Sequence, residues 1–508
     1  MAIRGRGWWL AGFTAGWVAV AACSGSSNNG SGDGGVPITP ADASAPDATV
    51  DVADAETPGA DASAPVDAAA PGTDAAVDYF GKPGPWPTDA MTAYLQSEAT
   101  EIIDVSTDEA QNIWAVSRSA LYLLQPGQTQ FKKFTGADGL HLSNAESPGI
   151  TAVAGGAAGE AFVGYQGTEV RNAQFDADKD RGKLDRVRLK ADGTLQVTFF
   201  AIRNNDALNH MAKDCQPLRL PDGGIDPNDT DWSYSEDRTA MRMVYDHLYH
   251  RGSLYVGYQH GVGRIDSGKP DKLTGQEWAD HVHPQVINAN GTPRQGEWRA
   301  LALDPSNRGG NTGVLWMGGR WTAGAIDWTP SLFEWTNNNY DCPPEYPKHN
   351  LLVAFSNSRA GVTDVRPVFN VNSGDSIYLH GIAPLSDGTV YFASGQGYDS
   401  QYGGPFGVAM WQGGANWTYL SPGGDLGLSS SGIVDMQRAP DDTILFVLDD
   451  GSLWRWNPNP KPRGVNLGRI TGLPAGATRV YVDAMTDPPG VYVATYRGFA
   501  LVRLPAKP

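Results

Sequence analysis

The sequence predicts an all-β fold, a β-propeller of seven blades, on three observations. From about residue 80 the chain consists of short apolar runs separated by Gly, Asp and Asn. In this region no apolar pattern with a helical period continues for more than a turn or two. One strand–turn–strand unit recurs seven times, and such units bury their faces only against neighbours. A closed ring gives every unit two neighbours and leaves only short sheet edges.

The first 22 residues have the pattern of a signal peptide. A short segment with two Arg precedes an apolar stretch, residues 8–19, which is shorter than the ~20 residues that span a bilayer core. Val20-Ala21-Ala22-Cys23 resembles the bacterial lipobox, in which the Cys is acylated and becomes the mature N-terminus. The resemblance implies lipidation of Cys23. Cleavage by an ordinary signal peptidase, with Cys23 incidental, is the alternative.

Residues 23–79 are predicted to form a disordered tether. They contain ten acidic residues, no basic one and almost no large apolar side chain, so they cannot bury enough surface to offset their ordering entropy. Of the formal net charge of −18, this segment contributes −10, residues 80–508 another −10, and the signal segment +2. Pro and like charge are expected to keep the tether extended and to hold the folded part away from a membrane. The acidic balance, without any run of Lys or Arg, disfavours nucleic acid as a partner.

Residues 80–508 are predicted to form the propeller. Each copy of the repeat begins with an apolar strand, at residues 102–105, 150–153, 243–245, 300–303, 381–385, 433–437 and 480–484. After a polar turn comes a second strand, at residues 112–116, 161–165, 254–257, 315–318, 390–393, 445–448 and 491–494. The aromatic residues of these second strands are assigned to the core; they are Trp114, Phe162, Tyr255, Trp316, Tyr391, Phe446 and Tyr492.

The two ends of this region are expected to meet. The last copy ends at residues 501–504 without an outer strand, whereas residues 90–95 ahead of the first copy look like an outer strand with no blade of its own. The N-terminal strand is therefore predicted to complete the last blade and close the ring.

The repeat resembles the two-component regulator propeller repeat. In that family an apolar strand, Asp and a Gly turn precede Leu/Ile-Trp-Val-Gly-Thr, Gly-Leu, and an outer strand that ends in Asp-Gly-Leu. Residues 108–124 followed by Phe131, Phe134, Thr135 and residues 138–140 match closely, as do residues 495–501. The resemblance covers roughly residues 85–508 and implies a fold rather than a chemistry. Family members are commonly sensory regions fused to a histidine kinase, but no spanning helix, kinase or DNA-binding domain follows here.

Long insertions are the expected place for function. The propeller has about 61 residues per blade, against ~40–50 in a typical repeat, and the excess lies near 166–240, 266–296 and 336–379. In the first insertion Asp176, Asp178, Asp180 and Asp185 alternate along a loop, an arrangement that lets several oxygens converge on Ca²⁺. A solvated acidic hairpin loop is the alternative.

A second metal candidate comprises histidines. His281 and His283 would lie on one side of an extended strand, which is a usable spacing for a transition metal. His260, and also His247 or His250, could provide a third ligand. Hydrogen-bonded loop histidines are the alternative, so Ca²⁺ or another divalent metal is the only cofactor class that the sequence suggests.

Two further groups of residues stand out, two cysteines in different insertions and aromatic residues in predicted loops. Cys215 and Cys342 are the two cysteines left when Cys23 is lipidated, and export to an oxidising compartment predicts a disulfide between them. Trp335 and Tyr340, and likewise Tyr398 and Tyr402, combine flat apolar faces with amide donors, as sugar-binding surfaces do. Blade packing and loop anchoring are the alternative for these aromatic residues.

No catalytic motif is present: the chain has no Gly-x-Ser-x-Gly, no P-loop and no His-Glu-x-x-His. We therefore expect a lipoprotein of the bacterial cell envelope, at the outer membrane in preference to the inner one. Its propeller is expected to act as a binding or scaffold module for a protein or glycan, with the lipid bilayer as a second partner. The alternative is an exported hydrolase or lyase with a divalent metal in the propeller channel.

Overall fold

The computed structural model of the protein describes the greater part of the predicted propeller. The described residues are 90–98, 101–142, 149–166, 170–171, 183–201, 234–235, 239–248, 252–258, 262–266, 278–282, 297–306, 308, 313–320, 322–327, 351–356, 363–364, 377–395 and 407–504. The chain divides into two units, Met1–Gly72 and Thr73–Pro508, and all described residues belong to the second. The predicted signal peptide, Cys23 and tether therefore lie outside the described residues. Among the described residues no helix has the length and apolarity needed to cross a bilayer.

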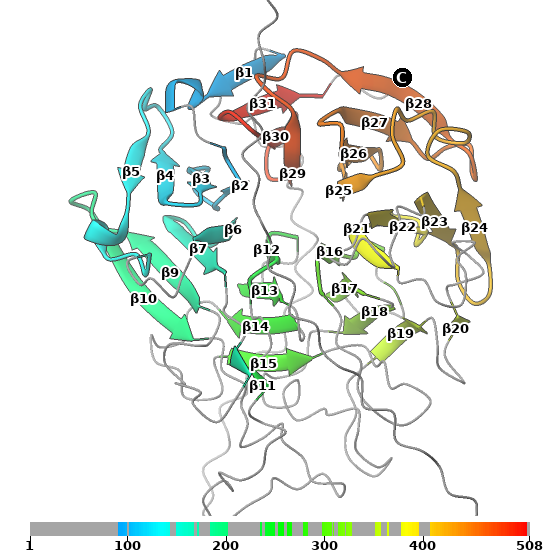
Figure 1. Cartoon of the computed structure of the whole chain (residues 1–508), viewed down its shortest axis with the longest axis horizontal. Helices are drawn as coiled ribbons and strands as arrows, with labels where there is room; N and C mark the ends of the chain where they lie inside the picture. The colour runs from blue at the N-terminus through cyan, green and yellow to red at the C-terminus, as the bar shows by residue number, and fades with distance from the viewer. Residues whose placement is uncertain are drawn as a thin grey trace, which may run out of the picture. The chain divides into compact units, whose positions relative to one another are not determined.

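In the described part of the chain, most strands form seven antiparallel blades of four strands each, arranged around one axis (Figure 1). Blades 5 and 6 are joined into one eight-stranded sheet by a parallel pair, Gly381 and Met436. The strands of each blade are given from the innermost outwards. Blade 1 comprises β2 (Asp104–Thr107), β3 (Ile113–Ser117), β4 (Ala120–Leu124) and β5 (Lys132–Phe134). Blade 2 comprises β6 (Ile150–Gly155), β7 (Glu160–Tyr165), β9 (Lys183–Leu189) and β10 (Leu195–Ala201), and blade 3 comprises β12 (Arg242–Tyr245), β13 (Ser253–Gly257), β14 (Val262–Asp266) and β15 (Trp278–Val282).

Blades 4 to 6 follow the same order. Blade 4 comprises β16 (Ala300–Leu303), β17 (Val314–Gly318), β18 (Thr322–Asp327) and β19 (Leu351–Ser356). Blade 5 comprises β21 (Tyr378–Pro384), β22 (Val390–Gly395), β23 (Gly407–Trp411) and β24 (Trp417–Leu420). Blade 6 comprises β25 (Ile433–Arg438), β26 (Ile444–Leu448), β27 (Leu453–Asn457) and β28 (Val465–Ile470). Outside this pattern, β20 (Thr363–Asp364) adds a parallel strand to β19, and β8 (Val170–Arg171) pairs with β11 (Tyr234–Ser235). Two short 3-10 helices, η2 (Gln96–Glu98) and η3 (Gly136–Asp138), complete the regular structure of the described residues.

Blade 7 is built from both ends of the propeller, which confirms the predicted closure. Its first three strands are β29 (Ala477–Asp483), β30 (Gly490–Thr495) and β31 (Phe499–Arg503). Its outer strand is β1 (Met91–Tyr94), which pairs antiparallel with β31. The ring of Tyr94 stacks on Phe499 at 5.1 Å between centroids and meets Phe131 of blade 1 edge-on at 5.8 Å. The N-terminal strand therefore joins the last blade to the first.

The core consists of seven apolar clusters, one between each pair of neighbouring blades. The cluster between blades 7 and 1, for example, joins Tyr492, Phe499 and Leu501 to Ile102 and Tyr122. All seven aromatic residues assigned to the core from the sequence are at most 1% exposed. Since each blade buries both of its faces against neighbours, seven clusters for seven blades mean that the ring is closed.

The innermost strands contact one another in sequence around the axis, from β2 through β6, β12, β16, β21 and β25 to β29 and back to β2. They run in the same direction, because residues near their beginnings contact each other and residues near their ends do likewise. Arg479 pairs with Asp104, for example, and Tyr481 with Thr107. β21 and β25 approach so closely that a Cβ on Gly381 would lie 2.3 Å from Cβ of Met436, and this closeness requires glycine.

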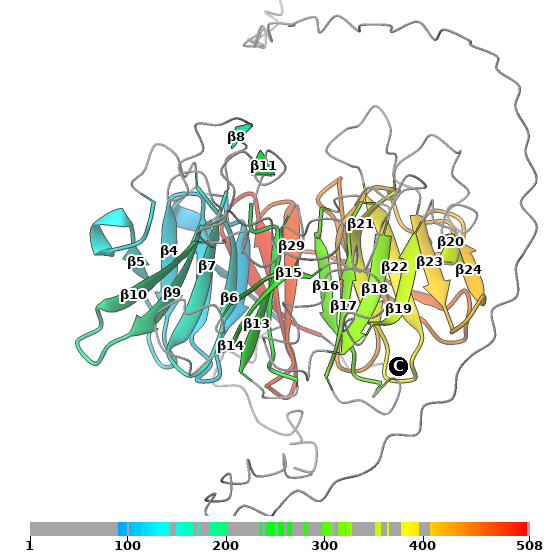
Figure 2. The ribbon, with the colours of Figure 1, turned by 90° about the horizontal axis from the view of Figure 1, so that it is seen from below.

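This common direction defines two faces. We call the face at which the inner strands begin the amino face and the opposite one the carboxyl face. The antiparallel order places the connections between second and third strands, and those between blades, on the amino face. β8 and β11, which belong to such connections in blade 2, lie together at one end of the strands (Figure 2). The connections between first and second strands and between third and fourth strands lie on the carboxyl face.

Candidate functional site

Most of the residues that the sequence singled out lie outside the described residues. These are Cys23, Asp176, Asp178, Asp180, Cys215, His260, His283, Trp335, Tyr340, Cys342, Tyr398 and Tyr402. For the two aromatic-rich segments, the described strands on either side nevertheless show from which face of the ring each segment starts. Residues 328–350 connect the third and fourth strands of blade 4, whereas residues 396–406 connect the second and third strands of blade 5. The two aromatic-rich segments thus start from opposite faces.

Asp185 was expected in a loop that binds Ca²⁺, and this prediction is wrong for its position. Asp185 lies inside β9 and is fully buried. Its Oδ2 accepts hydrogen bonds from the hydroxyl of Tyr165 at 2.5 Å and from the backbone N–H of His141 at 2.9 Å. Its Oδ1 lies 2.6 Å from Nδ1 of His141. The carboxylate therefore holds the segment after blade 1 against blade 2.

Of the histidine candidates, His281 lies away from the axis. His281 lies in β15, the outermost strand of blade 3, whereas β12 is the innermost. A channel site built on His281 would have to cross the width of a blade. No group of three or more His, Cys, Asp or Glu side chains with metal-binding geometry occurs within the described part of the chain.

The axis contains instead a network of buried charges, which begins with Arg479 of β29. Its Nη1 donates to Oδ2 of Asp104 in blade 1 at 2.9 Å, and its Nη2 donates to the backbone carbonyl of Met241 in blade 3 at 2.9 Å. Asp104 also accepts from the backbone N–H of Val153 in blade 2 at 3.1 Å. Burial acts to lower the pKa of Arg479, but the charges of Asp104 and Asp435 outweigh it and raise this pKa. Arg479 thus stays charged and joins three blades.

Arg242 and Asp435 make the second ion pair of this network. Nη1 of Arg242 in blade 3 donates to both carboxylate oxygens of Asp435 in blade 6, at 3.1 and 3.2 Å. Asp435 also accepts from the backbone N–H groups of Met436 and Val480, each at 2.9 Å. The side chains of Arg242 and Asp435 are 8% and 4% exposed. Two positive and two negative side chains therefore neutralise one another near the amino face.

Polar groups of a different kind lie near the carboxyl ends of the inner strands. Nε2 of His247 lies 3.1 Å from the carbonyl oxygen of Gly155, so this nitrogen carries the hydrogen. Burial lowers the pKa of His247 to about 4, although hydrogen bonds to the backbone of Gly155 and Thr107 act against it. The hydroxyl of Thr107 lies 3.2 Å from that of Tyr481.

A repeated Asp–aromatic pair connects the axis to the blades at the carboxyl face. In each such blade, one residue of the inner strand pairs with the aromatic residue of the second strand. The Asp lies two residues further along the chain than that inner-strand residue. Nε1 of Trp114 donates to Oδ2 of Asp108 at 2.9 Å in blade 1, and Nε1 of Trp316 donates to Oδ2 of Asp304 at 2.7 Å in blade 4. The corresponding pairs in blades 3 and 7 are Asp246 with Tyr255 and Asp483 with Tyr492. Burial raises the pKa of Asp108 to about 6, although its hydrogen bonds with Asn112, Trp114 and Ala110 oppose this rise.

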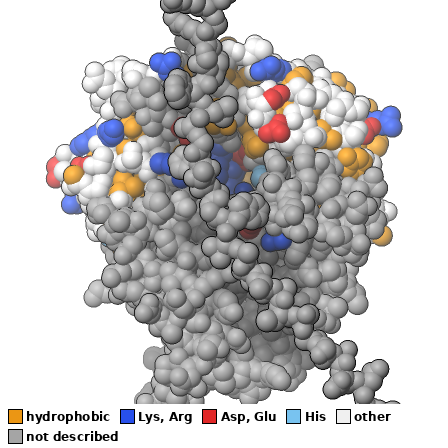
Figure 3. Space-filling view, in the orientation of Figure 1, with side chains coloured by type: hydrophobic (Ala, Val, Ile, Leu, Met, Phe, Trp, Pro, Cys, Tyr) orange, Lys and Arg blue, Asp and Glu red, His pale blue; other side chains and the backbone are white. Residues whose placement is uncertain are grey.

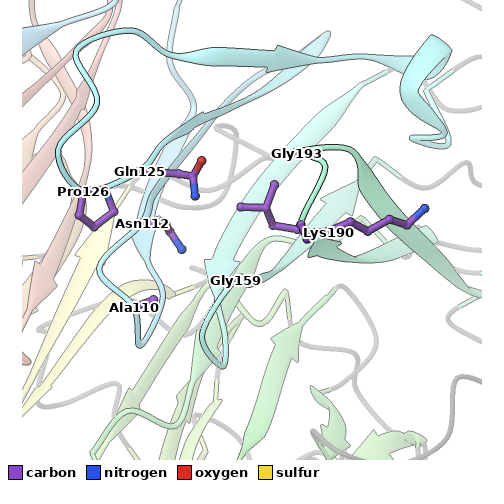
Figure 4. A pocket seen from close by; sticks show the side chains of 9 residues that line it. Ala110, Asn112, Gln125, Pro126, Gly159, Lys190 and Gly193 are labelled. Carbon is purple, nitrogen blue, oxygen red and sulfur yellow. The ribbon is translucent and has the colours of Figure 1, made fainter.

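A shallow pocket of about 420 Å³ opens on the carboxyl face between blades 1 and 2 (Figure 4). Its walls come from turns of both blades, and its lining consists of Ala110, Asn112, Gln125, Pro126, Gly159, Leu189, Lys190, Ala191 and Gly193. Asp108 lies next to it, because its Oδ2 accepts from the backbone N–H of Gly159 at 3.0 Å. The ammonium of Lys132 donates to the carbonyl of Gly193 at 2.6 Å, which ties the two walls together.

The amino face exposes an aromatic side chain. Tyr496, in the turn between β30 and β31, is 60% exposed and is the most exposed large apolar residue among those described. One edge of its ring lies over Gly476, where a Cβ would be 3.3 Å from Cδ2. Val434, near the beginning of β25, is also exposed. Figure 3 shows that Lys and Arg side chains occur both near the centre and at the rim of the visible face.

Comparison with known proteins adds a distant structural similarity. A solved structure described as "YCF48 bound to D1 peptide" is similar to this chain, with 13% sequence identity and a TM-score of 0.43. The similarity covers 84% of this chain and 100% of that one. No family model matches the sequence, and no curated protein matches it.

The axial ion pairs were missed from the sequence, although a signal exists. Asp104 and Asp435 lie within predicted inner strands and Arg479 directly precedes one, and Lys, Arg, Asp and Glu are almost never fully buried unless paired. The sequence does not reveal which charge pairs with which, because the paired residues are hundreds of positions apart.

Breaking the Arg242–Asp435 pair is expected to destabilise the ring. Arg242→Met leaves a buried carboxylate without its main counter-charge and should lower the free energy of unfolding by about 3 kcal/mol. Asp435→Leu should have a similar cost, whereas the double variant should lose about 2 kcal/mol less than the sum of the two. Urea unfolding of the four proteins measures this coupling. Arg438→Met is the control, because the Arg438–Asp442 pair is more exposed. Strict additivity would contradict the role of the pair.

His247 is expected to make stability depend on pH. Its pKa is about 4 in the folded protein and ~6.5 in an unfolded chain, so between these values the unfolded state binds more protons. Stability should therefore fall as the pH decreases from about 6.5 to 4, by up to about 3 kcal/mol from this group. His247→Gln lacks this titration. The difference in unfolding free energy between wild type and variant, measured in urea from pH 7 to pH 4, should shrink accordingly. A constant difference would contradict the assignment.

Proposed function

We propose that the protein is a lipid-anchored envelope protein whose propeller binds a protein or a glycan through its amino face. The structural observation on which this proposal rests is that the charged side chains at the axis pair with one another. Each axial carboxylate already accepts from an Arg and from backbone N–H groups, so these groups serve to hold blades together. A ligand would then bind at one of the two faces of the ring. The connections between strands vary most in length on the amino face.

Four observations support the amino face as the binding surface. The strand ends on either side of residues 202–233, 283–296, 357–362 and 396–406 all open on this face. Tyr496 presents an exposed aromatic ring there, and tyrosine combines a large apolar area with a polar tip, which suits both protein and sugar ligands. Arg497 follows it directly and provides a positive charge on the same turn. The aromatic-rich segment at 396–406, with Tyr398 and Tyr402, connects to the same face.

The anchor part of the proposal is tested at Cys23. The resemblance of residues 20–23 to a lipobox and of the whole repeat to the two-component regulator propeller family supports an exported, tethered propeller. In bacterial cells that express the full chain, Cys23→Ala should abolish incorporation of labelled palmitate and shift the protein from the membrane fraction to the soluble fraction. Cys215→Ala is the matched control and should leave both unchanged. Retention of the label in Cys23→Ala would contradict lipidation at this residue.

The binding face is tested by placing a photo-crosslinking amino acid on each face of the full chain. Tyr496 probes the amino face, and Asp192, in the turn between β9 and β10, probes the carboxyl face. Irradiated cells should yield crosslinked protein from position 496 and not from position 192. If the ligand is a glycan, a glycan array should show binding that Tyr496→Ala weakens about tenfold or more, as expected for a lost hot-spot aromatic. Crosslinks from position 192 alone, or no crosslink together with no array signal, would contradict the proposal.

A further inference from the structure

The pocket between blades 1 and 2 lies on the carboxyl face, on the side of the ring opposite to the proposed binding surface. Its volume of about 420 Å³ falls in the range of small-molecule sites, ~300–1,000 Å³. Blade 1 contributes the turn after β2, with Asn112, and the turn after β4, with Gln125 and Pro126. Blade 2 contributes the turn after β6, with Gly159, and the turn after β9, with Lys190. Two blades thus enclose one space.

One buried carboxylate, that of Asp108, fixes both walls of this pocket. Its Oδ1 accepts from the backbone N–H groups of Ala110 at 2.9 Å and Asn112 at 3.1 Å, both in blade 1. Its Oδ2 accepts from the side-chain amide of Asn112 at 2.7 Å and from the backbone N–H of Gly159 in blade 2 at 3.0 Å. Walls that are already held in place bind a ligand at a smaller entropic cost.

The charged groups around the pocket select a neutral ligand. Among the described residues that line it, Lys190 alone has a charged side chain, and Figure 4 shows this side chain directed away from Asn112 and Gln125. The ammonium of Lys132 donates to the carbonyl of Gly193 at 2.6 Å. Asp108 is fully buried behind the hydrogen bonds given above. A charged ligand would lose water here without gaining a counter-charge, and this loss is costly.

The remaining groups of the lining combine amides with apolar surface. The carboxamide of Gln125 both donates and accepts, and that of Asn112 is held through its nitrogen by Asp108, which leaves its oxygen as an acceptor. Pro126 and Leu189 provide apolar side chains. A pyranose ring matches this combination, because its hydroxyls donate and accept and its C–H faces are apolar. An extended peptide is typically bound along a strand edge, whereas turns form this pocket.

We propose that the pocket between blades 1 and 2 binds a neutral pyranose, with the ring against Pro126 and Leu189 and the hydroxyls bonded to Gln125 and Asn112. The site is a second one, separate from the amino face, and it does not depend on the function proposed above.

Ligand-observed NMR titrations with the purified full-length protein test the proposal. The probes are glucose, galactose, mannose and N-acetylglucosamine, each as the free sugar and as the methyl glycoside. At least one should bind, and Gln125→Ala should weaken its binding about fivefold, the effect of one typical hydrogen bond. Gln128→Ala is the matched control and should leave binding unchanged, because Gln128 is exposed in the same turn but does not line the pocket. Stronger binding of the methyl glycoside indicates the end of a glycan, and stronger binding of the free sugar indicates an unlinked sugar; both support the site.

Two further variants keep the test independent of Gln125. Ala191→Trp adds bulk to the wall in blade 2 and should abolish binding, with urea unfolding to show that the fold is retained. Tyr496→Ala, on the amino face, should have no effect, which separates this site from the surface proposed above. The proposal is overturned if no neutral sugar binds, if binding survives both Gln125→Ala and Ala191→Trp, or if glucuronate or a blocked dipeptide binds more tightly.

Discussion

The pairing of Arg479 with Asp104 is the contact on which the geometry of the axis depends. Arg479 links blades 7, 1 and 3, and Asp104 extends the link to blade 2 through the N–H of Val153. Asp435 adds blade 6, since it is bonded to Arg242 and to the N–H of Val480. A buried ion pair adds little net stability compared with apolar packing, but an unpaired charge there costs several kcal/mol. The charges therefore penalise any arrangement in which the blades are out of register.

A second regularity concerns which aromatic residue occurs in the second strand of each blade. Trp and Tyr occur at this position where an Asp lies across from it, as in Asp108–Trp114 and Asp304–Trp316. Blades 2 and 6, which have Gly156 and Arg438 instead of the Asp, have Phe162 and Phe446 there. Blade 5 is an exception, because it combines Leu385 with Tyr391. A buried Asp needs a donor, and a buried indole needs an acceptor, so in blades 1 and 4 each of the two residues satisfies the other.

The sequence was sufficient to predict the regular part of the fold. Apolar alternation located the inner and second strands of all seven blades, and the unpaired strand at residues 90–95 predicted the closure through β1. The candidate site was less accessible, because its contacts join residues far apart in sequence: Arg242 and Asp435 are 193 positions apart. Asp185 shows the opposite difficulty. Asp176, Asp178 and Asp180 precede it along the chain and suggest an acidic loop, yet Tyr165 and His141 from elsewhere satisfy its carboxylate inside a strand.

The position of β1 also determines how the ring resists mechanical load. β1 is antiparallel to β31, and its first residue, Met91, lies opposite Val502, so the chain enters blade 7 at the carboxyl face. A pull on Ala90 directed away from that face acts along the strand axis. Such a pull loads the hydrogen bonds between β1 and β31 in shear, all at once, and does not peel them apart one after another. Rupture would then require the simultaneous loss of this ladder and of the Tyr94–Phe499 stack, which makes the closing blade a strong point of attachment.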